Sequence, residues 1–257
     1  DAARNGHDVL ACTVRSCGAP LSLSPAGKAW LCPAGHAFDI ARKGYVNLLQ
    51  PQDRRSLEAG DSRDAVAARV RLLRRGFGSV LFADLLQVVK ALHLPAGSAA
   101  IELGSGTGLL LASLTAECGL AGFGVDLATP AIEQAAADHG RSATWIVANA
   151  DRRLPFVTGS ASLVLSVHAR RNPEEVRRIL RPGGYWLIAV PSTEDLQELR
   201  SVAQGPTSAR RRDEDILAEI AALPPGSLKL TLERKGDSRT VHHLDGTALA
   251  DACAGTY

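Results

Sequence analysis

Strand-like and helix-like segments alternate through residues 99–190, and this alternation constrains the fold more than any other feature of the chain. Short runs rich in Val, Ile and Leu are separated by loops or by helical patterns. The predicted strands are 99–103, 122–127, 144–150, 162–168 and 185–190, and the predicted helices are 109–119, 129–140 and 173–180. This order is typical of βαβ units in a doubly wound α/β domain with a parallel sheet. Strict alternation over 227–235 predicts a late strand, which we expect to be antiparallel.

Two helices are expected ahead of the first of these strands. The segment 61–75 has a helical pattern, either Asp61 or Ser62 can cap its first turn, and cations gather near its end. A second apolar helical pattern covers 81–94. Residues 38–50 predict a helix or a turn that leads into a short apolar segment.

A glycine-rich loop follows the first predicted strand of the sheet. The segment IELGSGTG, residues 101–108, joins that strand to the next helix, and its glycines allow a tight turn and a close approach of backbone to ligand. Asp126 ends the next strand, where a carboxylate can accept hydrogen bonds from both ribose hydroxyls. No G-K-[ST] follows, which argues against a triphosphate site. A bare G-x-G-x-G also occurs in plain strand–helix turns. The expected cofactor contacts in the loop are Gly104, Ser105, Gly106, Thr107 and Gly108.

Three further segments extend the pattern. Glu102 stands in the strand that leads into the loop, and two segments follow at suitable distances: ANADRRLPF at 148–156 and LRPGGYWLIAVP at 180–191. Together they resemble class I S-adenosylmethionine (SAM) methyltransferases, which have a Rossmann-like doubly wound sheet. The resemblance implies SAM as cofactor, with Asn149 or Asp151 at the adenine edge and Asp195 at the methionine end.

Four potential metal ligands stand near the start of the chain. The spacing C-x4-C, then fourteen residues, then C-x3-H predicts a closed, structural Cys3His zinc site. Its ligands would be Cys12, Cys17, Cys32 and His36. Cys118 and Cys253 are expected to be ordinary buried cysteines. No signal-peptide layout and no apolar run of roughly 18 residues are present, which predicts a cytoplasmic protein without disulfides. Unrelated thiols remain the alternative to a zinc site.

The front of the chain is more basic than the rest. Through Arg75 it carries twelve Lys and Arg against seven Asp and Glu, whereas the whole chain has a net charge of only +2. This surplus predicts a polyanion partner, unless it is merely a solvated face. The candidate phosphate contacts are Arg42, Lys43, Arg54 and Arg55. Tyr45 or Phe38 could stack on a splayed base, or could instead pack in the core.

A more specific resemblance rests on CPAGHAFDIARKGYVNLL at 32–49, GDS at 60–62 and VHARRNPEEVRRILRPGG at 167–184. These segments resemble the RlmA family of 23S rRNA guanine-N1 methyltransferases, and the last of them, with STEDLQELR, is similar to the branch linked to tylosin-type macrolide resistance. The resemblance implies an N-terminal zinc-binding module (1–50) that helps to hold an RNA hairpin, linker and leading helices (51–98), and a methyltransferase domain (99–257). It implies no membrane partner and leaves room for a homodimer.

The implied chemistry is in-line attack of a guanine ring nitrogen on a sulfonium methyl group, which needs positioning and a base turned out of its stack. His168 ends the fourth strand and is the candidate acceptor of the ring proton, although it could also be a capping or core histidine. Arg170 and Arg171 are candidates for holding the guanine carbonyl or a phosphate.

Two other functions remain open from the sequence. One is methylation of a small molecule or protein, with a zinc module that is only structural. The other is non-catalytic RNA binding with a degenerate cofactor pocket. The chain contains no Met and ends before a final strand that the sheet is expected to need, so we expect the natural protein to extend beyond both ends.

Overall fold

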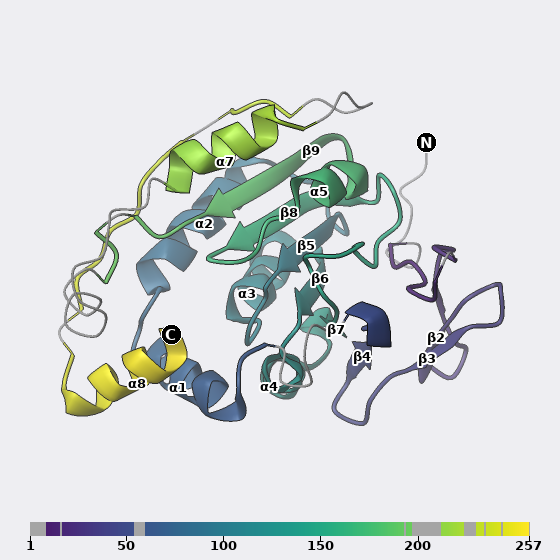
Figure 1. The fold of residues 1–257 in the computed structure, drawn as a ribbon, viewed down its shortest axis with the longest axis horizontal. Coiled ribbons are helices and arrows are strands. Elements are labelled where there is room, and N and C mark those ends of the chain that lie inside the picture. Colours follow the sequence, from purple (N-terminus) through teal and green to yellow (C-terminus); the bar gives the residue numbers. More distant parts are fainter. Residues whose placement is uncertain are drawn as a thin grey trace.

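A six-stranded parallel sheet forms the centre of the molecule, and a small antiparallel sheet lies beside it (Figure 1). The computed structural model describes residues 9–15, 17–53, 60–192, 194–196, 212–223, 230–233, 235–242 and 244–256. The large sheet has the order β4-β7-β6-β5-β8-β9. Its strands are β4 (Tyr45–Asn47), β5 (Ala99–Leu103), β6 (Ala121–Asp126), β7 (Ala143–Val147), β8 (Ala161–Val167) and β9 (Leu180–Ala189). The predicted doubly wound α/β fold is confirmed.

The helices are α1 (Arg63–Arg74), α2 (Ser79–Ala91), α3 (Leu109–Cys118), α4 (Thr129–His139), α5 (Pro173–Ile179), α7 (Arg212–Ala221) and α8 (Gly246–Thr256), with short 3-10 turns η2 (Pro51–Asp53) and η3 (Gly140–Ser142). Helices α2, α3 and α4 cover one face of this sheet, α5 lies on the other, and α1 and α8 pack on each other. As predicted, α1 begins after a cap: the Ser62 hydroxyl accepts a hydrogen bond from the Ala65 N–H at 3.2 Å. None of the described helices is long and apolar enough to cross a membrane.

The N-terminal sheet consists of β1 (Ser22–Leu23), β2 (Ala29–Leu31) and β3 (Ala37–Asp39), paired in an antiparallel order. Its inward-facing Trp30 and Phe38 belong to the same hydrophobic core as Ile101 and Val125 of the large sheet. The other face of the large sheet packs against α2, α3 and α4 in a second core. The N-terminal module therefore covers one face of the sheet together with α5 and shares its core.

For residues 38–50 the turn alternative is confirmed and the helix alternative is wrong: β3 ends at Asp39, the chain turns at Gly44 with a positive φ of 91°, and β4 then joins the large sheet beside β7. Two other expectations from the sequence are wrong. Residues 230–233 and 235 do not form the predicted late strand, and the remainder of that segment, 227–229 and 234, lies outside the described residues. Cys118 is only half-buried, and Cys253 is exposed on α8.

The direction of the crossover connections reverses between β5 and β8. From β5 the chain proceeds outward through β6 and β7 on one side, and through β8 and β9 on the other. In open α/β sheets a crevice forms at the carboxyl ends of the strands at this point. The glycine loop after β5 and the segment after β8 both start there, so the fold places the expected site residues at one edge of the sheet.

Candidate cofactor pocket and metal centre

The glycine loop is tied to the neighbouring strand β6 through one carboxylate. Asp126 Oδ2 accepts a hydrogen bond from the Gly106 N–H at 2.9 Å, and its Oδ1 accepts one from the Ala128 N–H at 2.8 Å. Burial raises the pKa of Asp126, while these two backbone bonds lower it. Asp126 thus fixes the loop and still has lone pairs that can accept from a ligand.

The three loop glycines have different surroundings. A Cβ on Gly104 would lie 2.5 Å from Ala169 Cβ, and a Cβ on Gly108 would lie 2.3 Å from the Trp145 ring. No described residue other than its chain neighbours lies within 4 Å of the place that a Cβ on Gly106 would take. The absence of a side chain at Gly104 therefore makes room for the segment after β8, and its absence at Gly108 lets α3 pack on β7. Gly106 lies on the open side of the loop.

Two buried polar atoms near this loop lack partners among the described residues: Glu102 Oε2 and Ser105 Oγ. The Glu102 residue is only 4% exposed. Burial raises its pKa to about 8, and the nearby Asp126 charge raises it too, while a backbone hydrogen bond from Leu111 lowers it. Because an unpaired buried carboxyl oxygen is costly, it suits a donor brought by a ligand, such as an amine.

The candidates for the adenine edge lie directly after β7. The Ala148 N–H donates to the Asp126 carbonyl at 3.0 Å, which holds this segment beside the pocket. The Asn149 side chain is buried, donates from Nδ2 to the Asp53 carbonyl, and accepts from the Asp151 N–H. The structure therefore gives Asn149 a role in shaping this segment, and its contact with adenine stays a prediction, as does that of Asp151.

Asp195 lies in a turn after β9, where its N–H donates to the Ser192 carbonyl at 3.2 Å. Its expected role at the methionine end stays a prediction. The buried Thr107 stands within the glycine loop, and its expected cofactor contact stays a prediction in the same way.

Residues 60–62, for which the sequence predicts no role in the pocket, lie against the chain directly after β6. Gly60 has φ 94°, and a Cβ there would lie 2.7 Å from Ala128 Cα. The negative charge of Asp61 raises the pKa of Asp126, and the positive charge of Arg69, which forms an ion pair with Asp61, lowers it. The GDS at 60–62 was the available signal, but the sequence alone did not place it beside the ribose candidate.

The candidate catalytic residues follow β8. His168 is exposed, has a positive φ of 51°, and donates its backbone N–H to the Ala189 carbonyl. Such a conformation is uncommon for a non-glycine residue and is often found at functional sites. Arg170 is exposed, whereas the Arg171 guanidinium forms two 3.0 Å bonds to the Glu219 carboxylate on α7. Arg171 is therefore held by a carboxylate in this structure, and Arg170 is the better placed arginine for a substrate.

The four predicted metal ligands come together in the N-terminal module. The donor atoms of Cys12, Cys17, Cys32 and His36 all lie within 4.8 Å of one another. Cys12 Sγ is 3.4 Å from His36 Nδ1, and Cys17 Sγ is 3.4 Å from Cys32 Sγ. A tetrahedral zinc with Zn–S bonds of about 2.3 Å separates its sulfurs by about 3.8 Å. The donor set and its spacing fit a structural zinc ion.

The thiol chemistry agrees with a metal at this position. The pKa of Cys12 is raised to about 12, chiefly by burial and also by the neighbouring thiols Cys17 and Cys32, although the backbone hydrogen bond from Val14 lowers it. A bound dication offsets this penalty because it stabilises thiolates directly.

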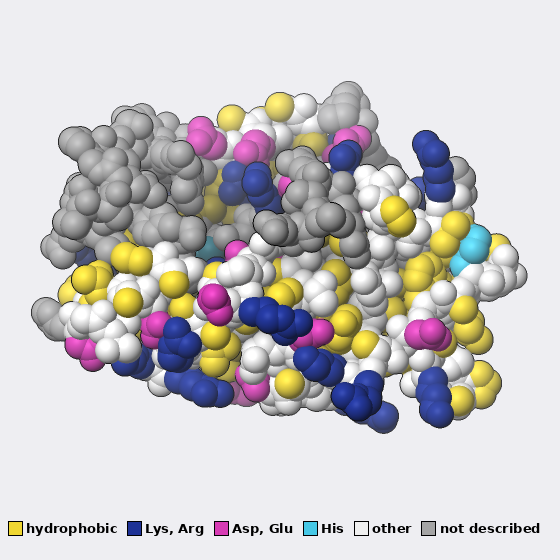
Figure 2. Space-filling view, turned by 60° about the horizontal axis from the view of Figure 1, so that its bottom comes forward, with side chains coloured by type: hydrophobic (Ala, Val, Ile, Leu, Met, Phe, Trp, Pro, Cys, Tyr) yellow, Lys and Arg dark blue, Asp and Glu magenta, His cyan; other side chains and the backbone are white. Residues whose placement is uncertain are grey.

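Several cations of the basic front end are paired with carboxylates. Figure 2 shows Lys and Arg side chains spread along this side of the molecule, with acidic side chains among them. Lys43 and Arg63 both bind Glu133 on α4, at 2.9 and 3.1 Å. Arg42 and Arg74 are exposed and form no ion pair with any described residue. Arg54 and Arg55 lie outside the described residues.

A second group of these pairs joins α1 to α8. Arg71 binds Asp251, and Arg75 binds Asp245. Of the candidate stacking residues, Phe38 is a core residue and Tyr45 is half-buried in β4. The core alternative for Phe38 is confirmed.

Comparisons with known proteins match both parts of the chain. A family model described as RlmA, N-terminal, a zinc ribbon, matches residues 12–57, and one described as a methyltransferase domain matches residues 100–184. The 23S rRNA (guanine(748)-N(1))-methyltransferase of Streptomyces fradiae is 39% identical over 240 residues, which cover 93% of this chain and 81% of that protein. A relative from Micromonospora griseorubida, provisionally named a 23S rRNA (guanine-N(1)-)-methyltransferase, is 36% identical over 206 residues, which cover 74% of this chain and 68% of its own.

Proposed function

The chain belongs to the family of RlmA-type 23S rRNA (guanine-N1)-methyltransferases, and from this premise we propose that it transfers a methyl group from SAM to N1 of a guanine in a 23S rRNA hairpin. The observation that carries the proposal is the pairing of a Cys3His ribbon with a glycine loop that still has unsatisfied polar atoms. A degenerate pocket would not be expected to keep the Asp126–Gly106 bond and an open Gly106.

The residues of the pocket fit the proposed cofactor. Asp126 would accept from the ribose hydroxyls, and Gly106 leaves room for close approach of the ligand. Glu102, with an oxygen that lacks a donor, would accept from the ammonium group of the amino-acid tail. When bound, SAM supplies an electrophilic methyl group on a positively charged sulfur.

The substrate side would be formed by the segment after β8. Gly104 packs against Ala169, so His168 and Arg170 flank a residue that touches the cofactor loop. His168 would accept the proton that guanine N1 loses, and Arg170 would hold the guanine carbonyl or a phosphate. Arg171 could take part only after leaving Glu219.

The zinc ribbon would hold the RNA and not the reacting base. Cys3His sites are closed and structural, so the metal contributes to folding of the module. We keep the division into a module at 1–50, a linker and helices at 51–98 and a methyltransferase domain at 99–257, with the addition that β4 joins the large sheet. A homodimer and a role in macrolide resistance stay predictions from the family resemblance, and a cytoplasmic location stays a prediction from the sequence pattern.

Transfer of a tritiated methyl group from SAM to ribosomal RNA tests the proposal. We expect label in 23S rRNA, and primer extension should stop at one guanine because an N1-methyl group blocks base pairing. Label in protein or in small molecules, with none in RNA, would favour a methyltransferase of another substrate class. No transfer together with no SAM binding would favour a non-catalytic RNA-binding protein.

A further inference from the structure

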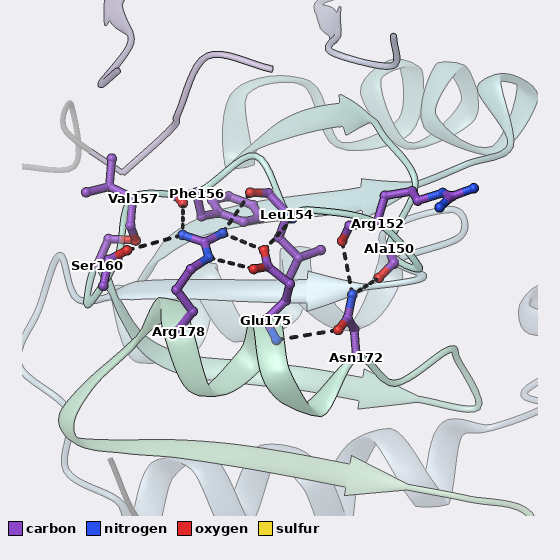
Figure 3. Close-up of polar contacts among 10 residues, drawn as sticks. Ala150, Arg152, Leu154, Phe156, Val157, Ser160, Asn172, Glu175 and Arg178 are labelled. Atoms are coloured by element: carbon purple, nitrogen blue, oxygen red, sulfur yellow. Dashed lines mark hydrogen bonds and ion pairs between the residues drawn. The ribbon is translucent and has the colours of Figure 1, made fainter. Parts of the chain in front are cut away.

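Helix α5 turns its polar side chains onto the segment that follows β7 (Figure 3). Asn172 caps the helix and donates from Nδ2 to the carbonyls of Ala150 and Arg152, both at 3.0 Å. One turn later, Glu175 Oε2 accepts the Leu154 N–H at 2.7 Å. These bonds fix a stretch of chain that has no regular secondary structure of its own.

Arg178 makes the largest set of these contacts. Its guanidinium donates to the Phe156 carbonyl at 2.7 Å and to the Leu154 carbonyl at 3.0 Å. The same group binds both carboxylate oxygens of Glu175, at 2.7 and 2.6 Å. The three nitrogens of the planar guanidinium form four bonds to two carbonyls and both carboxylate oxygens, whereas a lysine ammonium has only three donors, all on one nitrogen, and cannot form all four.

One end of this segment reaches the cofactor pocket. The Ala148 N–H donates to the carbonyl of Asp126, and the Asn149 side-chain oxygen accepts the N–H of Asp151, two residues further on. The distance along the chain from Asp151 to the first Arg178 contact, Leu154, is only three residues. A change in the path at Leu154 would therefore move the groups beside the ribose candidate.

The other end carries the zinc ribbon. The Ala11 N–H donates to the Pro155 carbonyl and the Val157 N–H donates to the Val9 carbonyl, both at 2.9 Å. A bridge between Leu10 and Phe156 lies between these bonds. The segment 9–11 that leads into Cys12 is thus paired with residues 155–157, of which Phe156 gives its carbonyl to Arg178.

A second contact joins the same segment to the metal centre. Arg153 Nη2 lies 2.8 Å from the place that a Cβ on Gly18 would take, so the guanidinium packs directly on the residue after Cys17. Gly18 has φ 65° and donates its N–H to the Cys12 carbonyl. The ligand loop of the ribbon and the segment after β7 therefore touch at two separate places.

We propose that Arg178 is a positioning residue that, with Glu175, holds residues 150–157 in the one path that serves both the zinc ribbon and the SAM pocket. Zinc binding in the ribbon and SAM binding in the pocket then favour each other, since each stabilises the same path of the segment. The effect of Arg178 on SAM binding, the cofactor half of this inference, rests on the proposed function. Its effect on the zinc ribbon, the ribbon half, does not.

The variant Arg178→Lys tests the clamp, which is the pair Arg178 and Glu175 with their bonds to this segment, in the full-length, zinc-loaded protein. Lysine keeps the charge and the long side chain but cannot form all four bonds to Leu154, Phe156 and Glu175. By calorimetry we expect SAM affinity to fall by at least about fivefold, the lower end of ordinary coupling between sites. The control is Arg141→Lys, the same substitution at an exposed arginine before β7, at the opposite end of that strand from the pocket. It should leave affinity unchanged.

Hydrogen exchange of single amides measures the ribbon half without any cofactor. In Arg178→Lys the amides of Ala11 and Val157 should exchange faster, while amides in β5 and β6 keep their protection. Uniformly faster exchange would show a general loss of stability and overturn the proposal. If Arg178→Lys fails to fold, Glu175→Gln, which keeps one acceptor for the Leu154 N–H, should give the same pattern more weakly.

Zinc removal tests the link itself. A chelator should weaken SAM binding by the wild-type protein. The fold-loss of SAM affinity on zinc removal should be smaller in Arg178→Lys, because the effect of zinc reaches the pocket through the clamp. Unchanged affinity after chelation, or an equal factor in both proteins, would overturn the link. A wild-type protein that binds no SAM would contradict the proposed function, and the exchange experiment would still decide whether Arg178 clamps the ribbon.

Discussion

The carboxylate of Asp126 accepts the backbone N–H of Gly106 at 2.9 Å, so the end of β6 and the loop after β5 are one unit. A residue expected only to bind ribose also holds the loop on which the cofactor would lie. Removal of its carboxylate should therefore affect ligand contact and loop geometry at once.

Asp126→Asn should weaken SAM binding with little change in fold. The amide keeps one acceptor oxygen, so either Gly106 or Ala128 loses its partner, and the charge-assisted bond to ribose is lost. Hydrogen bonds to charged groups contribute about 1.5–3 kcal/mol, which corresponds to roughly a ten- to hundredfold loss of affinity. Calorimetric titration measures it, with Asp138→Asn on the exposed side of α4 as control. Wild-type affinity would show that the pocket lies elsewhere.

His168→Asn should slow methyl transfer and leave SAM binding intact. Asparagine tolerates the left-handed backbone that His168 adopts, so the substitution removes the imidazole with little strain. General acid–base groups typically contribute about a hundredfold or more to rate. His93 offers a matched control, because it too has a positive φ, of 48°, but lies after α2. If single-turnover rates of the two variants are alike, His168 has no role in proton transfer.

The parallel sheet could be predicted because its strands are short, continuous apolar runs. Ile101 and Val164 are fully buried, as expected for strands covered on both faces. The edge strand β4 could not be predicted in the same way. It has three residues, and its partner Trp145 lies a hundred residues away, so only the tertiary fold shows the pairing.

The metal ligands could be predicted from spacing, but the clamp on α5 could not. In the sequence, Glu175 and Arg178 form an i,i+3 pair of the kind that usually lies on a solvated helix face. In the structure both turn toward backbone groups of a loop, which carry no sequence signal because every residue has them. The prediction of a late strand is wrong because an alternating pattern is not enough to form one: residues 230–233 have no neighbouring strand to pair with among the described residues.

Purified protein should contain about one zinc per chain, and Cys32→Ser should lose most of it. Cys32 Sγ faces Cys17 Sγ at 3.4 Å in the centre of the ribbon, so its loss opens the ligand shell. Elemental analysis gives the ratio, with Cys118→Ser as control because Cys118 lies outside the cluster. A Cys32→Ser protein that kept its full zinc content would exclude this set of ligands.

The stability of the protein should fall as pH rises from 5 to 8, in part because of Glu102. Its pKa in the folded state is about 8, above the usual 4.5, so the folded state binds the extra proton in this window. The unfolded state has released this proton in the same window, so stability falls as pH rises, by at most about 1.4 kcal/mol per pH unit, until pH reaches the pKa of the folded state. Glu102→Gln should unfold in denaturant with a weaker pH dependence than the wild type. Parallel curves would mean that Glu102 is ionised at neutral pH.

Salt dependence of RNA binding should separate two neighbouring cations in the turn before β4. Arg42 is exposed and forms no ion pair with a described residue, whereas Lys43 is bound to Glu133, which Arg63 also binds. Each neutralised phosphate contributes about one unit to the slope of log affinity against log salt. We expect Arg42→Ala to flatten the slope for a ribosomal hairpin by about one unit, and Lys43→Ala to change it less.

The reason for this difference is that a cation already neutralised by a carboxylate releases fewer counterions from RNA. Replacement of Arg54 and Arg55 together, outside the described residues, should flatten the slope by about one to two units. SAM affinity should not change in the Arg42→Ala and Lys43→Ala variants, because both residues precede β4, whereas Asp126 and the glycine loop lie at the carboxyl ends of the parallel strands. We expect unchanged SAM affinity in the Arg54→Ala/Arg55→Ala protein as well. Equal slopes in the wild type and in both the Arg42→Ala and Arg54→Ala/Arg55→Ala proteins would remove the electrostatic argument that the front end grips RNA. The ribbon would then act on the substrate only through the path of residues 150–157.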